Sequence, residues 1–336
     1  MKILSIIIPT YNMEKYLERC LSSLIVDDNE LMHALDILVI IDGATDKSAE
    51  IALNYQKQYP GTFRVIEKEN GNYGSCINRG LKEATGKYIK ILDADDTFDT
   101  TNFKEFVLLL QHTEADCVIS AMTQVTEDGN VCENVHFDLP TSDYFTLDDL
   151  GSAAVSMWMH CVCLLTDNIR KINYHQSEGI SYTDQEWIGL PVSTCRKIIY
   201  YPKVVYLYLV GREGQTVDPI VWEKNFWQEI KGMQVMLKQR RTLYDGCSAA
   251  GKRYFETRIL TRLATIYRNY FLKFRGYNNN DLMAELDKVL QLEHLDLYNE
   301  TGNFRLLQFF YYVRHWRKTY QADFYLKAIK VLAKFV

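Results

Sequence analysis

The sequence lacks an uninterrupted apolar run long enough to cross a lipid bilayer, so it predicts no membrane-spanning helix. It also lacks a visible N-terminal signal pattern, because the apolar run of residues 1–8 stops at Pro9. Positive charge is not in excess: the net charge of −5 gives no indication of a nucleic-acid partner. We therefore expect a globular protein of the cytoplasm.

The eight cysteines include no C-x-x-C pair, and Cys161 and Cys163 have no second Cys or His pair at zinc-finger spacing. We expect them to be reduced and mostly buried. The length of 336 residues suffices for one large domain with an appendage or for two modest domains.

Apolar strand-like runs alternate with helical patterns through the first third of the chain. Strands are predicted at residues 3–8, 37–41, 63–66, 88–92 and 117–120, and helices at 13–24, 49–59, 73–84 and 102–112. This alternation predicts an α/β fold with a parallel sheet covered on both faces. Ligands bind such sheets at the carboxyl ends of the strands, where polar clusters occur at residues 9–12, 42–46 and 93–96.

The pattern changes after the first third. Short β-like runs at 158–165, 198–201 and 204–209 mix with short helices, and from about Val221 the sequence is mostly helical. We expect one domain at residues 1–217, with a nucleotide-sugar half at about 1–120 and an acceptor half at about 121–217. A helical C-terminal domain would follow at 218–336.

The stretch YIKILDADDT places Asp93, Asp95 and Asp96 directly after a predicted buried strand. Carboxylates this close repel one another, and a hard divalent cation such as Mg²⁺ or Mn²⁺ would remove that cost. The alternative is a solvated acidic turn that caps the next helix. That alternative accounts for Asp99 and Thr100, but it accounts poorly for Asp93.

Three segments in order, SIIIPTYN, IDGATD and ENGNYGSCINRGLKEATGKYIKILDADD, resemble the donor half of family-2 glycosyltransferases with the GT-A fold. The resemblance is close over about the first hundred residues and continues faintly to about Val217. It implies a mixed, Rossmann-like sheet flanked by helices, a UDP-sugar donor and a divalent metal, Mn²⁺ or Mg²⁺.

The resemblance also implies roles for individual residues. Asp42 would accept the N3–H of uracil, Asp95 would be the principal metal ligand, and Asp93 would contact the ribose or sugar. Asp93 and Asp96 are the other candidate metal ligands. The donor-binding candidates are Pro9, Tyr11, Asp42, Asn70, Asn78, Asp93, Ala94, Arg212 and Gln215. Asn12 has an alternative role as the N-cap of the helix predicted at 13–24.

The chain departs from the family pattern at three positions, where Ile41, Ile77 and Thr183 replace the usual aspartate, arginine and glutamate. The change at Ile77 weakens the expectation of a cationic contact from that helix. The same departures keep open an inactive, glycan-binding or nucleotide-sugar-binding partner subunit. A sugar-phosphate nucleotidyltransferase is a further alternative, although PTYN lacks the Gly-rich basic loop of that class.

Asp184, in the segment TDQEW, matches the general base of the family, and Glu186 is the reserve candidate. The alternative for Asp184 is a pure N-cap role at a helix through Leu190. Arg212 and Gln215 lie where the family closes a loop over the diphosphate, although a plain Gly-bounded turn explains them equally well. Trp158, Trp187 and His160 are acceptor-side candidates, with packed core residues as the default.

The sequence thus predicts an inverting glycosyltransferase that moves a hexose or N-acetylhexosamine from a UDP-sugar to a glycan, lipid-linked or glycoprotein acceptor.

The segment from Asn303 has seven Lys/Arg against one Asp, a net charge of +6, and is rich in aromatic residues. We expect it to pack or to mediate homo-oligomerisation. Peripheral contact with the inner face of the cell membrane is the alternative.

Overall fold

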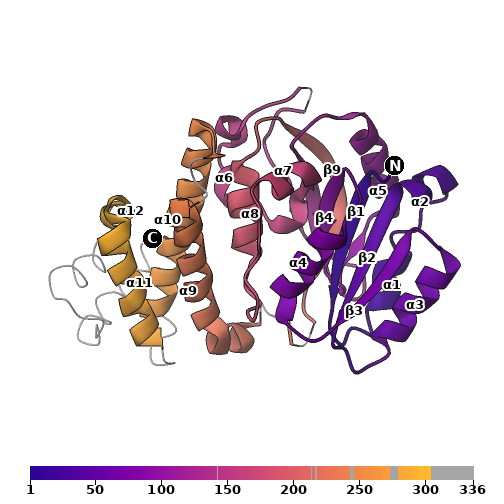
Figure 1. Ribbon diagram of the computed structural model, residues 1–336, viewed down its shortest axis with the longest axis horizontal. Helices are drawn as coiled ribbons and strands as arrows, with labels where there is room; N and C mark the ends of the chain where they lie inside the picture. The colour runs from indigo at the N-terminus through magenta and orange to yellow at the C-terminus, as the bar shows by residue number, and fades with distance from the viewer. Residues whose placement is uncertain (142, 213, 216–217, 243–245, 273–278, 304–336) are drawn as a thin grey trace. The chain divides into compact units, whose positions relative to one another are not determined.

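The computed structural model describes residues 1–303 except 142, 213, 216–217, 243–245 and 273–278 (Figure 1). The chain divides into two compact units. The first contains Met1–Glu213 and Gly246–Lys252, and the second contains Gly214–Asp245 and Arg253–Val336. The functional boundary expected near residue 217 stays a prediction. The basic C-terminal segment, beyond Asn303 itself, lies outside the described residues.

A nine-stranded mixed sheet forms the centre of the first unit. Its strands are β1 (Leu4–Thr10), β2 (Leu35–Asp42), β3 (Phe63–Lys68), β4 (Tyr88–Ile91), β5 (Thr97–Phe98), β6 (Cys117–Val125), β7 (Val131–Val135), β8 (Val162–Leu165) and β9 (Ile198–Leu209). The strand order is β3-β2-β1-β4-β8-β6-β9-β5, and β7 pairs with β6.

The sheet is parallel only in part, which corrects the simple parallel sheet predicted from the apolar runs. Strands β1, β2, β3 and β4 are parallel where they pair with one another, whereas β8 is antiparallel to both β4 and β6. Apolar runs report burial on both faces but carry no information on strand direction. Strand β8 is also shorter than predicted, because residues 159–161 form a 3₁₀ turn, η2 (Met159–Cys161).

Helices of the first unit flank this sheet (Figure 1). They are α1 (Leu17–Ser22), α2 (Asn29–Ala34), α3 (Ser48–Gln58), α4 (Asn72–Glu83), α5 (Thr100–His112), α6 (Ala153–Ser156), α7 (Thr166–Lys171) and α8 (Asp184–Ser193), with a 3₁₀ helix η1 (Leu147–Leu150). Asp99 caps α5 by accepting the Asn102 N–H at 2.9 Å, as predicted. Helix α4 packs closely on β1, since a Cβ at Gly80 would lie 2.5 Å from the Ile7 side chain.

Most of the described second unit is helical. It contains α9 (Pro219–Thr242), most of α10 (Ala249–Leu272), α11 (Asn279–Glu293) and α12 (Leu295–Glu300). Arg240 of α9 pairs with Glu256 of α10 and Asp296 of α12, each at 2.6 Å. None of the helices in the described ranges combines the length and apolar character that crossing a membrane requires.

Candidate active site

The acidic turn of Asp93, Ala94, Asp95 and Asp96 follows directly on β4. The Asp96 N–H donates to the Asp93 carbonyl at 3.0 Å, which closes the turn at the carboxyl end of the strand. Ala94 is buried, and so are Asp95 and Asp96, whereas Asp93 is partly exposed. The turn therefore brings three carboxyl groups together with little water to separate their charges.

Strand β9 holds Asp96. The Tyr206 hydroxyl donates to Oδ2 and the Leu209 N–H donates to Oδ1, each at 2.6 Å. These bonds favour the carboxylate, but burial and then the charges of Asp95 and Asp93 act more strongly. The pKa of Asp96 is consequently well above its ordinary value. A positive charge placed beside Asp96 would oppose that shift, because it favours the charged carboxylate.

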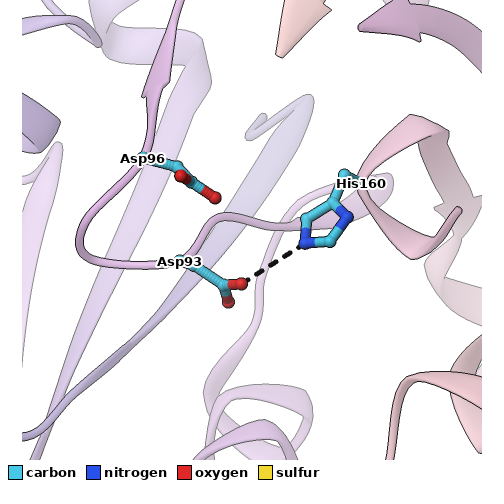
Figure 2. Close-up of side chains that lie close together, drawn as sticks. All are labelled: Asp93, Asp96 and His160. Carbon is cyan, nitrogen blue, oxygen red and sulfur yellow. Dashed lines mark hydrogen bonds and ion pairs between the residues drawn. The ribbon is translucent and has the colours of Figure 1, made fainter. Parts of the chain in front are cut away.

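Asp93 faces His160 from the other side of the turn (Figure 2). The Tyr73 hydroxyl donates to Asp93 Oδ1 at 2.7 Å, and His160 Nε2 lies 3.3 Å from Oδ2. One ligand atom each from Asp93, Asp96 and His160 lies within 4.8 Å of the others. The sequence analysis did not assign His160 to this cluster, because 67 residues separate it from Asp93 and no linear spacing indicates the contact.

The structure pairs Asp95 with Arg212 instead of placing it in that cluster. Arg212 Nε donates to Asp95 Oδ2 at 2.7 Å, and the guanidinium lies 5.6 Å from the centre of the Tyr16 ring. Burial and the charge of Asp93 still raise the pKa of Asp95, because Arg212 offsets them only in part. Two residues predicted separately from the sequence are thus brought together.

The donor atoms at Asp93, Asp96 and His160 fit a divalent cation. Carboxylate oxygens are typical ligands of Mg²⁺ and Mn²⁺, and a neutral imidazole suits transition metals better than Mg²⁺. Burial and then the charges of Asp95 and Asp93 raise the pKa of the Asp96 carboxyl, and an added cation would favour its charged form. The cluster can therefore hold one divalent ion.

A second polar group lies at the end of β2, two strands from β4. Asp42 is buried, and its Oδ1 accepts from Lys68 Nζ at 2.5 Å and from the Gly71 N–H at 3.0 Å. Asn70 donates its side-chain N–H to the Asp42 carbonyl at 2.9 Å. Asp42 and Lys68 are direct partners in the β2–β3 ladder, so a correct strand register would have indicated the pair.

Pro9 and Tyr11 lie beside this group at the end of β1, which pairs with both β2 and β4. Tyr11 is 50% exposed. The N-cap role considered for Asn12 is wrong. Asn12 has a φ of 52°, α1 begins only at Leu17, and Asn12 Oδ1 accepts from the Thr45 N–H at 2.9 Å.

Asn78 is engaged with the segment that precedes α8. Its Nδ2 donates to the Gln176 carbonyl at 2.9 Å and to Glu178 Oε1 at 2.8 Å, and its Oδ1 accepts from the Gln176 N–H at 2.8 Å. The structure thus joins Asn78 to the 176–178 segment by both ends of its amide.

Asp184 is the first residue of α8 and is partly exposed. The N-cap position belongs to Thr183, which makes no side-chain cap bond, so the N-cap alternative for Asp184 is wrong. The charge of Asp184 contributes to raising the pKa of Tyr73 and of Tyr208, after burial and the charges of the acidic turn.

Glu186, one residue beyond Gln185 in the same helix, has different surroundings. It is 1% exposed, its Oε2 accepts from the Ser177 N–H at 3.0 Å, and its Oε1 has no hydrogen-bond partner among the described residues. Burial raises the pKa of Glu186 to about 7. This carboxyl group holds the loop before α8 through the Ser177 N–H, and its burial leaves little access to an acceptor sugar.

The remaining candidates occupy three kinds of position. Trp187 is fully buried, as the core default predicted, whereas Trp158 is 38% exposed and its ring lies 5.8 Å from that of Tyr208. Gln215 is buried and belongs to the second unit, whereas the acidic turn belongs to the first. Thr216, its neighbour, lies outside the described residues.

Comparison with solved structures identifies the fold. The chain matches the crystal structure of Staphylococcus aureus TarS residues 1–349 in complex with UDP-GlcNAc, with a TM-score of 0.67 and 17% identity. The match covers 92% of this chain and 87% of that one, and a second TarS structure, in complex with UDP, gives the same TM-score. The first unit thus has the GT-A fold, and a helical C-terminal region follows it.

Residues 5–164 match the family model described as glycosyl transferase family 2. Uncharacterized glycosyltransferase YibD of Escherichia coli is 30% identical over 212 residues, which cover 61% of this chain and 60% of YibD. Uncharacterized glycosyltransferase EpsJ of Bacillus subtilis is 34% identical over 116 residues, 34% of this chain and 33% of EpsJ. The similarity to glycosyl transferase family 2 thus covers residues 5–164 of this chain.

Proposed function

We propose that the protein transfers a hexose or N-acetylhexosamine from a UDP-sugar to a hydroxyl group of a glycan, lipid-linked or glycoprotein acceptor. The observation that carries this proposal is the arrangement of two polar groups at one edge of the sheet. Asp42 ends β2, the acidic turn follows β4, and β1 lies between those strands. A base-binding group and a diphosphate-binding group at this separation suit one nucleotide.

The Asp42 group would bind the uracil. A carboxylate accepts the N3–H of uracil, whereas cytosine has no hydrogen at N3. Lys68 and the Gly71 N–H hold Oδ1 of Asp42 and so fix the orientation of the carboxylate. Tyr11 offers an exposed ring on which a base can stack, and Pro9 and Asn70 would complete the walls.

Asp93, Asp96 and His160 would hold a divalent cation, and the imidazole favours Mn²⁺ over Mg²⁺. When bound, that cation would supply positive charge to the diphosphate of the UDP leaving group. Asp95 engages Arg212 through Oδ2, so we propose Oδ1 as its ligand atom. Arg212 would itself contact the diphosphate, since a guanidinium suits phosphate oxygens.

Asp184 would act as the general base. The acceptor oxygen attacks the anomeric carbon as its proton passes to the Asp184 carboxylate, and UDP leaves with the bonding electrons from the opposite face. This single displacement inverts the configuration of the sugar. The partial exposure of Asp184 and the effect of its charge on the pKa of Tyr73, after burial and Asp93, support this assignment over Glu186, which is buried against Ser177.

The test compares Asp184→Asn with Glu186→Gln as its matched control. UDP release is measured with Mn²⁺ from UDP-glucose, UDP-galactose and their N-acetyl forms, with water and then with candidate sugars as acceptors. Asp184→Asn should lower kcat by roughly 10²–10⁴, the usual contribution of a general base, and leave the Kd for UDP unchanged. Glu186→Gln should keep the parent kcat.

Parent-like kcat in Asp184→Asn would assign the base elsewhere. UDP and Mn²⁺ binding without any UDP release would instead support an inactive partner subunit. The chain spans only 60% and 33% of the length of the relatives YibD and EpsJ, so the activity and partners of the whole protein belong to this proposal. The cytoplasmic location, membrane contact, oligomerisation and a separate role for residues 218–336 also stay predictions.

A further inference from the structure

A lysine lies buried directly beneath the acidic turn. Lys90 of β4 is 0% exposed, and Ile91 and Leu92 separate it from Asp93. It forms no ion pair with a carboxylate within the described part of the chain. Burial lowers the pKa of the Lys90 ammonium, which reflects the cost of keeping a charge in this place.

Two backbone carbonyl oxygens accept hydrogen bonds from the Lys90 ammonium group. Nζ donates to the His160 carbonyl at 2.6 Å and lies 3.4 Å from the Val162 carbonyl. The nearer bond goes to the residue whose imidazole faces Asp93. Aromatic rings lie around the ammonium with their centres 5.8–6.0 Å away, which partly replaces its hydration; they belong to Phe98, Phe106 and Tyr206.

The sheet explains why a lysine is useful at this point. The β4–β8 ladder contains only the pairs Tyr88–Leu165 and Ile89–Leu164, and beyond them the chain turns through η2. The His160 carbonyl is therefore not paired across β4 by a ladder bond. The Lys90 ammonium reaches across this gap and fixes the carbonyl from the floor of the site.

We infer that Lys90 is a positioning residue for the cation site: its ammonium holds the His160 backbone so that the imidazole can bind the metal together with Asp93 and Asp96. This inference rests on the cation site of the proposed function. Groups that orient a metal ligand from behind typically change metal affinity 10- to 100-fold when they are lost.

Lys90→Met tests the inference, because it removes the donor and keeps much of the volume. Lys87→Met is the matched control, since Lys87 also donates to a backbone carbonyl, that of Thr113 at 2.7 Å. Mn²⁺ affinity is measured by calorimetry with saturating UDP. Pulsed electron paramagnetic resonance of Mn²⁺ on protein labelled with ¹⁵N-histidine reports directly whether an imidazole binds the metal.

Lys90→Met should bind Mn²⁺ roughly 10- to 100-fold more weakly and lose the ¹⁵N coupling. Its Kd for UDP without metal should match the parent, and Lys87→Met should match the parent in all three measurements. Lys90→Gln retains one donor and should recover part of the coupling. Near-ultraviolet circular dichroism verifies that each variant is folded.

The outcomes separate the two proposals. If Lys90→Met is folded and keeps both the coupling and the parent affinity, the positioning role is overturned and the metal site stands. If the parent itself shows no ¹⁵N coupling, His160 is not a ligand, and both the metal assignment and the Lys90 role fail. If neither Lys90 variant folds, Lys90 serves the fold and the inference is overturned.

Discussion

Glu186→Gln should change the pH dependence of stability in a direction opposite to that of most carboxylate substitutions. Glu186 is 1% exposed, and burial raises its pKa from 4.5 to about 7. Between these values the folded protein keeps a proton that the unfolded chain has lost. The free energy of unfolding of the parent therefore falls as the pH rises from about 4.5 to 7.

The size of the effect follows from the shift. At about 1.36 kcal/mol per pKa unit, charging Glu186 costs the folded state roughly 3 kcal/mol above pH 7 and less than about 1 kcal/mol at pH 5. The amide of Gln cannot ionise, so it removes this dependence. Its NH₂ group would take the position of Oε1, which has no partner among the described residues. A buried donor without a partner destabilises the folded state by about 1–3 kcal/mol at every pH.

The diagnostic quantity is therefore the stability of Glu186→Gln relative to the parent at two pH values. It should become more favourable by about 2.5 kcal/mol between pH 5 and pH 8. Urea unfolding monitored by circular dichroism measures it. Glu178→Gln, at a carboxylate that is 48% exposed, controls for the loss of one charge from the same segment. A relative stability that does not change with pH would refute the reasoning.

Two other substitutions test the donor side. Asp42→Asn breaks the ion pair with Lys68 and places an amide donor opposite N3 of the base. UDP should therefore bind more weakly, and CDP should compete better. Equal UDP affinity in calorimetry would give Asp42 a purely structural role. Gly74→Ala places a Cβ 1.8 Å from the Ser177 carbonyl oxygen and should cost at least 1–3 kcal/mol, whereas Gly246→Ala meets no atom within 4 Å. Equal melting temperatures for these two alanine variants would contradict the close approach of α4 to the backbone at Ser177.

The strands and polar clusters of the first hundred residues could be predicted because they depend on local sequence patterns. Each parallel strand is a short apolar run, and the polar residues that end β2 and β4 come directly after those runs. Asp42 and the acidic turn were found in this way, together with the Asp99 cap. The helix at residues 29–34 was missed, because six residues are too few to display a helical period.

Contacts between residues far apart in the sequence could not be predicted from local patterns. His160 reaches Asp93 only because β8 pairs antiparallel with β4, and neither strand direction nor that pairing appears in a local pattern. Lys90 looked like an ordinary position in a strand, since its carbonyl partners lie 70 and 72 residues away. The family resemblance agrees with the family model at residues 5–164, whereas the division into donor and acceptor halves stays a prediction.

The acidic turn compensates its three carboxyl groups in three different ways, and only one of them brings a full positive charge. Asp96 receives two neutral donors from β9, Asp93 receives the Tyr73 hydroxyl and faces His160, and Asp95 alone has a guanidinium. Burial and then the mutual repulsion of the carboxyl groups raise the pKa values of Asp95 and Asp96, and Arg212 offsets this only in part at Asp95. Three partly compensated carboxyl groups stabilise an added cation more than a turn without acidic residues would. This attraction is the physical reason to expect metal-dependent chemistry at this edge of the sheet.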